Sequence, residues 1–224
     1  MPAADTLSAV LFDMDGLLVD TEPTWTVAEV ELAARLGGTW TPQIKASVVG
    51  TRVETAVPII LTAFGLEPTA PLVERTTREL LARMVELFGG ELKPLPGALE
   101  LLGALREAGV PVALVSSSYR VLVDAVVARL GLTFDFLLAG DEVSRAKPHP
   151  EPYLAACAQL GAAPGAAVVL EDSPAGIRSG EAAGCAVVAV PSVPGVHPEP
   201  GPRRLVLDSL TDLDLARLRD LVAG

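Results

Sequence analysis

Cysteine is scarce in this sequence of 224 residues, which contains only Cys157 and Cys185. The two cysteines lie far apart and fall in no Cys-x-x-Cys or histidine-associated spacing. The sequence therefore predicts neither a disulfide framework nor a structural zinc site. Reduced thiols of this kind are typical of a protein that stays in the cytoplasm.

Long hydrophobic runs are missing as well, although 50% of the residues are hydrophobic. No apolar stretch approaches the ~18 residues that a membrane span needs. The first ten residues, MPAADTLSAV, lack the basic start and apolar centre of a signal peptide. We therefore expect a soluble cytoplasmic protein with no membrane partner. Its length and composition are enough for one large domain, or for a domain with a smaller one.

Basic residues are too few to balance the acidic ones, and the formal net charge is −11. Nucleic acid is bound by clustered Lys and Arg, and the sequence has no such cluster, so we expect no nucleic-acid partner. A small phosphorylated ligand is still compatible with this negative net charge, because a metal ion and a few local cations can dominate the electrostatic field inside a cleft. The sequence leaves the oligomeric state open, and a monomer is compatible with it.

Lysine is scarcer than arginine in this chain, and it occurs only as Lys45, Lys93 and Lys147.

Short apolar runs rich in Val and Leu recur along the chain, and each is typical of a strand buried on both faces. Stretches with helical spacing separate most of them, and Gly109 and Gly131 each follow such a stretch. This alternation predicts an α/β fold, with a Rossmann-like parallel sheet flanked by helices on both sides. The predicted strands are Ala9–Phe12, Val110–Val115, Phe136–Ala139, Ala167–Leu170, Ala186–Val190 and Leu205–Leu207.

Residues 23–93 break this alternation. They contain no strand-like run, only helical patterns such as the one that includes Val27 and Val30 and the longer one over Leu72–Phe88. We therefore predict an all-helical cap domain inserted after the first strand. The predicted boundaries are residues 1–19 and 94–224 for the core catalytic domain and residues 20–93 for the cap.

Polar and charged side chains follow the predicted strands at their carboxyl ends, where ligands bind in a parallel α/β sheet. Asp13 and Asp15 follow the first strand, and Gly16 lets the chain turn there. Carboxylates from two strands are the ligands that Mg²⁺ prefers. An aspartate at a strand end can also attack phosphorus, and a second carboxyl nearby can give and take protons. The other candidates are Ser116, Ser117 and Ser118 after the second strand, Lys147 in a proline-stiffened loop, and Glu171 with Asp172 after the fourth.

Each of these features has a simpler explanation when taken alone. An Asp-x-Asp-Gly segment is commonly a turn, serines commonly cap helices, and a single lysine is commonly exposed to solvent. A helix that begins near Ser116 would nevertheless direct free N–H groups at a phosphate. The conjunction of four such segments at one sheet edge favours chemistry over capping.

Four segments of the chain resemble, in order, the four motifs of the haloacid dehalogenase superfamily of hydrolases. They are FDMDG at 12–16, LVSSS at 114–118, AKPHPEPY at 146–153 and LEDSPAGI at 170–177. The helical insert resembles the first type of cap in that superfamily. Within it the chain is similar to the β-phosphoglucomutase-like subfamily. The segments VDTEPTW at 19–25 and VVGTRVE at 48–54 are most similar to its sugar-phosphate phosphatases of the 2-deoxyglucose-6-phosphate type.

The resemblance implies a role for each matching residue. Asp13 would be the catalytic nucleophile, and Asp15 would be the catalytic acid and base. The groups implied to bind Mg²⁺ are the Asp13 carboxylate, the Asp15 carbonyl, Asp172 and, as an additional or outer ligand, Glu171. The groups implied to bind the phosphoryl oxygens are Ser116, the Ser117 backbone and Lys147.

The resemblance leaves three alternatives to weigh. Dehalogenases of the superfamily attack carbon, need no Mg²⁺ and lack the second aspartate, so Asp15 argues for phosphorus. A β-phosphoglucomutase-type mutase would carry a histidine where this chain has Trp25, and a lysine that the segment ERTTRE lacks, although Arg52 lies one position from the mutase arginine. A catalytically idle binding or regulatory protein on this fold would have lost a core acid or the lysine. We therefore expect a Mg²⁺-dependent phosphatase that acts on a small phosphorylated sugar or polyol, with Glu22, Trp25 and Arg52 facing the leaving group.

Overall fold

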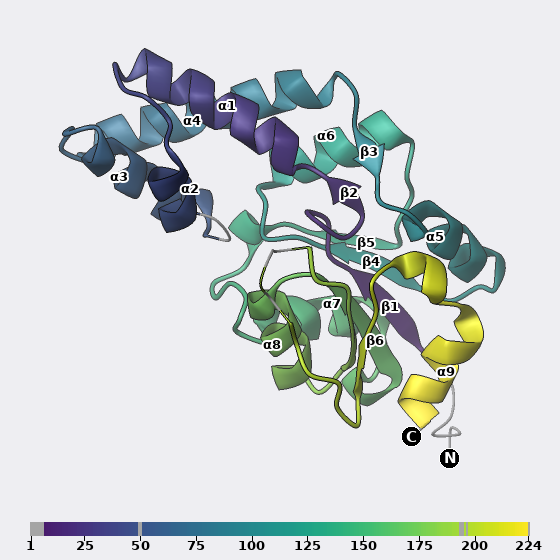
Figure 1. Ribbon diagram of the computed structural model, residues 1–224. Coiled ribbons are helices and arrows are strands. Elements are labelled where there is room, and N and C mark those ends of the chain that lie inside the picture. Colours follow the sequence, from purple (N-terminus) through teal and green to yellow (C-terminus); the bar gives the residue numbers. More distant parts are fainter. Residues whose placement is uncertain (1–6, 49–50, 193–194, 196, 224) are drawn as a thin grey trace.

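Six strands form a single parallel sheet in the order β5-β4-β1-β6-β7-β8 (Figure 1). The computed structural model describes residues 7–48, 51–192, 195 and 197–223. All six predicted strands are confirmed, with ends that differ from the prediction by at most two residues. Their bounds are β1 Ala9–Phe12, β4 Val112–Val115, β5 Phe136–Leu138, β6 Ala167–Glu171, β7 Ala186–Ala189 and β8 Arg204–Val206.

Helices cover both faces of the sheet, as the alternation in the sequence predicts. On β1, Val10 and Phe12 point into the larger hydrophobic core, while Ala9 and Leu11 point into the smaller one on the opposite face. This division follows from the two-residue period of a strand. Helices α5 (Ala98–Glu107), α6 (Arg120–Leu130) and α9 (Leu215–Ala223) contribute to the larger core, and α7 (Glu151–Leu160) and α8 (Pro174–Ala182) contribute to the smaller one. Short 3₁₀ turns occur at Gly140–Glu142 (η1), Pro164–Ala166 (η2) and Leu210–Asp212 (η3).

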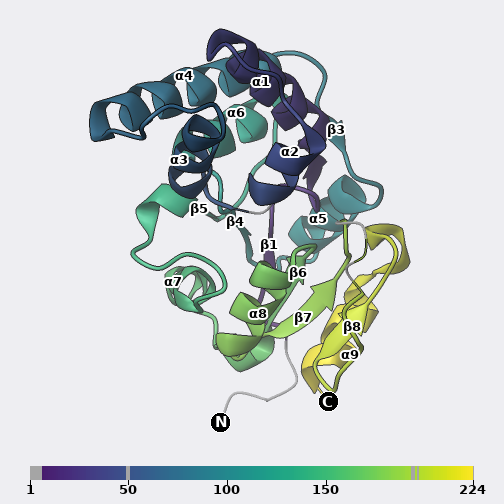
Figure 2. The same cartoon turned by 60° about the vertical axis from the view of Figure 1, so that its left-hand side comes forward.

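Four further helices lie together over one end of the core in both views (Figures 1 and 2). They are α1 (Glu22–Arg35), α2 (Pro42–Val48), α3 (Val53–Ala63) and α4 (Ala70–Phe88). Helix α4 also contacts α6 of the core. No helix in the described part of the chain is both long and apolar enough to cross a membrane.

The buried face of α1 is formed by small residues and leucine rather than by its valines. Val27 and Val30 are 44% and 47% exposed, whereas Ala28 and Leu32 are buried. Helix α1 packs along α4, and small alanines permit a closer approach between helices than valines do. The prediction of a helix is therefore confirmed, although the two valines of its pattern lie on the exposed side.

A second, two-stranded antiparallel sheet joins the four helices to the core. Its strands are β2 (Val19–Asp20) and β3 (Lys93–Pro94), in the register Val19↔Pro94 and Asp20↔Lys93. Strands of two residues carry no periodic signal, so the sequence could not predict them. The predicted domain boundaries fall inside this ribbon, and the division into core and cap remains our proposal. Expectations that concern residues 1–6, 49–50, 193–194, 196 and 224 lie outside the described residues.

Candidate active site

Lys147 joins the ends of three central strands. Its Nζ donates to Asp13 Oδ1 at 2.6 Å and to Glu171 Oε1 at 2.7 Å. A third bond, at 2.8 Å, goes to the backbone carbonyl of Val115 at the end of β4. Only 4% of the Lys147 side chain is exposed. Burial opposes the charge, but the carboxylates of Asp13 and Glu171 hold the pKa of Lys147 above its ordinary value.

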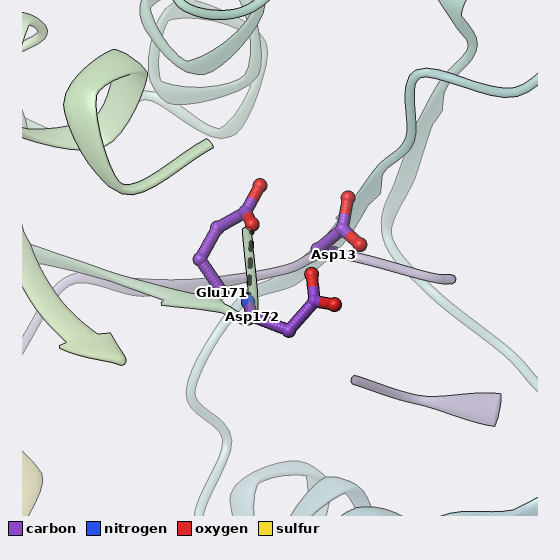
Figure 3. A group of neighbouring side chains, drawn as sticks. All are labelled: Asp13, Glu171 and Asp172. Carbon is purple, nitrogen blue, oxygen red and sulfur yellow. Dashed lines mark hydrogen bonds between the residues drawn. The ribbon is translucent and has the colours of Figure 1, made fainter. Parts of the chain in front are cut away.

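Three carboxylates converge beside this ammonium group from the ends of β1 and β6 (Figure 3). One oxygen from each of Asp13, Glu171 and Asp172 lies within 4.8 Å of the others, and all three residues are buried. Burial and the neighbouring Glu171 raise the pKa of Asp13 well above its ordinary value, against the opposing effect of Lys147. The same two causes raise the pKa of Asp172 to about 7. The residues present fit a hard divalent cation, because it prefers oxygen ligands and would relieve this repulsion.

Glu171 positions its neighbours. Its Oε1 accepts a second hydrogen bond, from the Tyr153 hydroxyl at 2.7 Å. Its Oε2 accepts from the Asp172 N–H and from the N–H and hydroxyl of Ser173, at 3.1, 3.1 and 3.0 Å. A Cβ on Gly176 would lie only 1.6 Å from Oε1. Both oxygens of Glu171 are thus already engaged, whereas Asp13 Oδ2 and Asp172 Oδ1 accept no hydrogen bond from the described residues.

Asp15 is held by three hydroxyl groups. Thr21 donates to Oδ1 at 2.6 Å, and Ser118 and Ser116 donate to Oδ2 at 2.8 and 3.2 Å. Ser116 also accepts the Ser118 N–H at 2.9 Å, which fixes the loop after β4. The structure therefore places the Ser116 hydroxyl against Asp15. The phosphate-binding role predicted for it stays a prediction.

The loop of Ser117 meets the cap through Gly140. A Cβ on Gly140 would lie 2.1 Å from the Ser117 carbonyl oxygen, so only glycine allows this approach. The Gly140 carbonyl in turn accepts a hydrogen bond from the Arg52 guanidinium, at the start of α3. The Nε of Arg52 is buried and has no partner among the described residues.

Glu22 and Trp25 lie on α1, within the cap. Lys45 Nζ bonds both Glu22 and Glu29, at 2.7 Å each. Trp25 is half-buried against the larger hydrophobic core. The contact of either residue with a leaving group remains a prediction.

We predict that Lys45→Met destabilises the cap. Burial raises the pKa of Glu29, and the hydrogen bond from Lys45 opposes that shift. Removing the ammonium leaves the Glu29 carboxylate, whose side chain is 9% exposed, without a cation. We expect the free energy of unfolding in urea to fall by about 2 kcal/mol. The double variant with Glu29→Leu should recover most of this loss, and an equal loss in both would contradict the explanation.

Three residues of the site, Tyr153, Thr21 and Ser192, were not singled out from the sequence. Tyr153 lies inside the segment AKPHPEPY and Thr21 lies inside the segment VDTEPTW, so only their positions in these segments marked them. Ser192 donates to the Asp172 carboxylate from a proline-rich loop, and no sequence signal distinguished it.

The comparisons with known proteins agree with this geometry. The family model of haloacid dehalogenase-like hydrolases matches residues 7–184. Hexitol phosphatase B of Escherichia coli (strain K12) is 32% identical over 96% of this chain and 94% of its own length. N-acetylmuramic acid 6-phosphate phosphatase of Pseudomonas aeruginosa is 34% identical over 92% of this chain and 91% of its own length. The crystal structure of CbbY from Rhodobacter sphaeroides in complex with phosphate superposes with a TM-score of 0.85, at 30% identity over 95% of this chain and 99% of that one. The chain thus belongs to the haloacid dehalogenase-like hydrolases.

Proposed function

We propose that this enzyme is a Mg²⁺-dependent phosphatase that hydrolyses a small phosphorylated sugar or polyol through an aspartyl-phosphate intermediate. The observation that carries the proposal is the meeting of Asp13, Lys147 and Asp172, which come from three distant parts of the chain. A carboxylate nucleophile, a buried ammonium and a second carboxylate form a set suited to phosphoryl transfer.

Asp13 acts as the nucleophile in this mechanism. A carboxylate oxygen of Asp13 attacks phosphorus, and the bond between phosphorus and the sugar oxygen breaks. Lys147 supports this step, because its ammonium is fixed beside Asp13 and can stabilise charge that spreads over the phosphoryl oxygens. The Ser116 hydroxyl and the Ser117 N–H are the further groups that we assign to those oxygens.

Asp15 acts as the general acid in the first step and as the general base in the second. It protonates the leaving alkoxide in the first step, then takes a proton from water, whose oxygen attacks phosphorus and displaces Asp13. Its hydroxyl partners suit both states, since a hydroxyl donates to a carboxylate and can rotate to accept from a carboxylic acid. The bonds from Thr21 and Ser118 keep the group in one orientation when the Ser116 hydroxyl turns to the phosphoryl oxygens.

Mg²⁺ would be held by the carboxylates of Asp13 and Asp172 and the backbone carbonyl of Asp15, with Glu171 placed behind them. When bound, the ion supplies charge neutralisation for the transferring phosphoryl group. Glu171 contributes indirectly, because it orients Lys147 and the backbone of Asp172.

The substrate class rests on the relatives. Two of them are named for phosphatase activity on a hexitol phosphate and on N-acetylmuramic acid 6-phosphate. We propose that Glu22, Trp25 and Arg52 of the cap face the leaving group of such a compound. The cytoplasmic location stays a prediction from the sequence.

Phosphate release from a panel of sugar and polyol phosphates, with and without EDTA, tests the proposal. We expect release from at least one hexitol phosphate or hexose 6-phosphate, loss of about 10³-fold or more in EDTA, and recovery on adding Mg²⁺. Unchanged phosphate release in EDTA would exclude a requirement for Mg²⁺. Conversion of an aldose 1-phosphate to its 6-phosphate without phosphate release would indicate a mutase. Failure on every ester would favour an idle binding protein.

We predict that Gly16→Ala weakens the response to Mg²⁺. Gly16 has φ +82°, and an added Cβ would lie 2.3 Å from Asp172 Oδ2 and 2.7 Å from Ser192 Oγ. Asp172 must therefore move, and we expect the Mg²⁺ concentration for half-maximal activity to rise about tenfold or more. Gly184→Ala is the matched control, because Gly184 has the same φ and no described heavy atom within 4 Å of the added Cβ. If both variants raised the Mg²⁺ concentration for half-maximal activity equally, backbone strain alone would explain the change.

A further inference from the structure

Tyr153 is a fully buried tyrosine on α7 that touches both partners of a buried ion pair. Its hydroxyl donates to Glu171 Oε1 at 2.7 Å. The centroid of its ring lies 4.8 Å from Lys147 Nζ. The mechanism above assigns no role to this side chain.

Every donor of the Lys147 ammonium group is engaged in this structure. A protonated lysine has three N–H donors and no acceptor. Lys147 Nζ already bonds Asp13 Oδ1, Glu171 Oε1 and the Val115 carbonyl. The proposed function requires the same ammonium group to bind a phosphoryl oxygen. One of the three bonds must therefore be given up when the phosphate ester enters.

Glu171 Oε1 is the acceptor that can release the ammonium group at the lowest cost. Among the three acceptors, only this oxygen has a second side-chain donor in the described part of the chain, which is the Tyr153 hydroxyl. The bond to Asp13 Oδ1 also keeps the ammonium group beside the nucleophile. A buried carboxylate oxygen that loses its last donor costs the desolvation of a charged group. Because Tyr153 remains bonded to Glu171, the release of Lys147 avoids most of that cost.

We propose that the Tyr153 hydroxyl is a positioning group that lets Lys147 turn from Glu171 to the transferring phosphoryl group. When the ester binds, Lys147 Nζ exchanges Glu171 Oε1 for a phosphoryl oxygen and keeps its bond to Asp13. Glu171 Oε1 then keeps the Tyr153 hydroxyl as its donor. The aromatic ring stays close to the ammonium group on either side of this exchange and stabilises its charge. The inference rests on the proposed function and adds to it the group that frees Lys147.

The variant Tyr153→Phe tests this role, because it removes the hydroxyl and keeps the ring. Its readout is the Kd of inorganic phosphate at saturating Mg²⁺, measured by titration calorimetry on the full-length protein. In the variant, phosphate can bind Lys147 only by leaving Glu171 Oε1 without a donor. We expect the Kd to rise about tenfold or more. An unchanged Kd would overturn the proposal.

Tyr119→Phe is the matched control, since the chain has only two tyrosines. Burial and Glu54 of the cap raise the pKa of Tyr119, and its hydroxyl forms no described bond to Glu171 or Lys147. We expect the phosphate Kd of this variant to stay within twofold of the native value. A rise equal to that of Tyr153→Phe would mean that the loss of any tyrosine hydroxyl near the site suffices, and would overturn the specific role of Tyr153.

A double-mutant cycle with Glu171→Gln separates positioning from a structural role. A neutral amide oxygen tolerates a missing donor better than a carboxylate oxygen does. Tyr153→Phe should therefore raise the phosphate Kd by about threefold or less in the Glu171→Gln background. Equal rises in the two backgrounds would overturn the route through Glu171. A purely structural role would lower the midpoint of urea unfolding in both backgrounds without this dependence of the Kd on Glu171.

A second measurement, of catalysis, distinguishes failure of this inference from failure of the proposed function. We expect Tyr153→Phe to lower kcat/KM for the phosphate ester about tenfold or more, because Lys147 must make the same exchange to reach the transition state. A native enzyme that is active, beside a variant with unchanged kcat/KM, would overturn the inference alone. A native protein that neither binds phosphate nor hydrolyses any ester would count against the proposed function, and the inference would fall with it.

Discussion

The Asp13→Asn variant should release phosphate at least about 10⁴-fold more slowly than the native enzyme, at saturating substrate and Mg²⁺. An amide cannot form the aspartyl-phosphate, although it keeps the shape of the aspartate and can still accept a hydrogen bond from Lys147. Burial and Glu171 raise the pKa of Asp13, so a neutral amide is tolerated in the fold. We therefore expect the free energy of unfolding to stay the same or to rise.

Asp20→Asn is the matched control for this change. Asp20 is exposed on β2, close in sequence and with the same chemical alteration. It should retain native kcat. An Asp13→Asn enzyme that kept its rate to within tenfold would exclude Asp13 as the nucleophile, because an asparagine side chain cannot form the aspartyl-phosphate.

Lys147→Met should cost both activity and stability. The ammonium bonds Asp13, Glu171 and the Val115 carbonyl, so its loss leaves two buried carboxylates without their cation. We expect kcat/KM to fall about 10³-fold. We also expect the free energy of unfolding at pH 8, measured in urea, to fall by about 3–5 kcal/mol.

The stability loss in Lys147→Met should depend on pH. Without the ammonium, the pKa of Asp13 rises further above its value in the unfolded chain. A carboxyl whose pKa is raised by folding destabilises the protein increasingly as pH rises from the unfolded pKa to the folded one. The loss should therefore be smaller at pH 5 than at pH 8. Lys93→Met, at a lysine whose side chain is 73% exposed, should show neither effect, and a loss independent of pH would contradict the electrostatic explanation.

The sheet could be predicted from the sequence because its four central strands, β4, β1, β6 and β7, are buried on both faces. Runs such as Val112–Val115 and Ala186–Ala189 are apolar throughout, which a helix with one exposed side does not require. Asp13 and Asp172 could be expected to meet because they follow the carboxyl ends of β1 and β6, whereas Lys147 reaches them from the loop between η1 and α7.

The cap was harder to predict, because its packing depends on shape. On α1 the exposed Val30 and the buried Glu29 reverse what hydrophobicity alone indicates. Glu29 is tolerated inside because Lys45, from a different helix, supplies its cation. Ser192 reaches Asp172 from a loop with no periodic pattern. These contacts are set by tertiary structure, which a single sequence does not encode in its local spacing.

The position of β1 in the sheet has a consequence for synthesis of the chain. β1 leaves the ribosome before both of its partners: it pairs on one side with β4, as in Val10↔Val112, and on the other with β6, as in Val10↔Val168. Until β6 has been translated, the strand that precedes Asp13 has an unpaired edge, which can pair with other nascent chains. The order of strands therefore makes completion of β6 the event that protects the centre of the fold from aggregation.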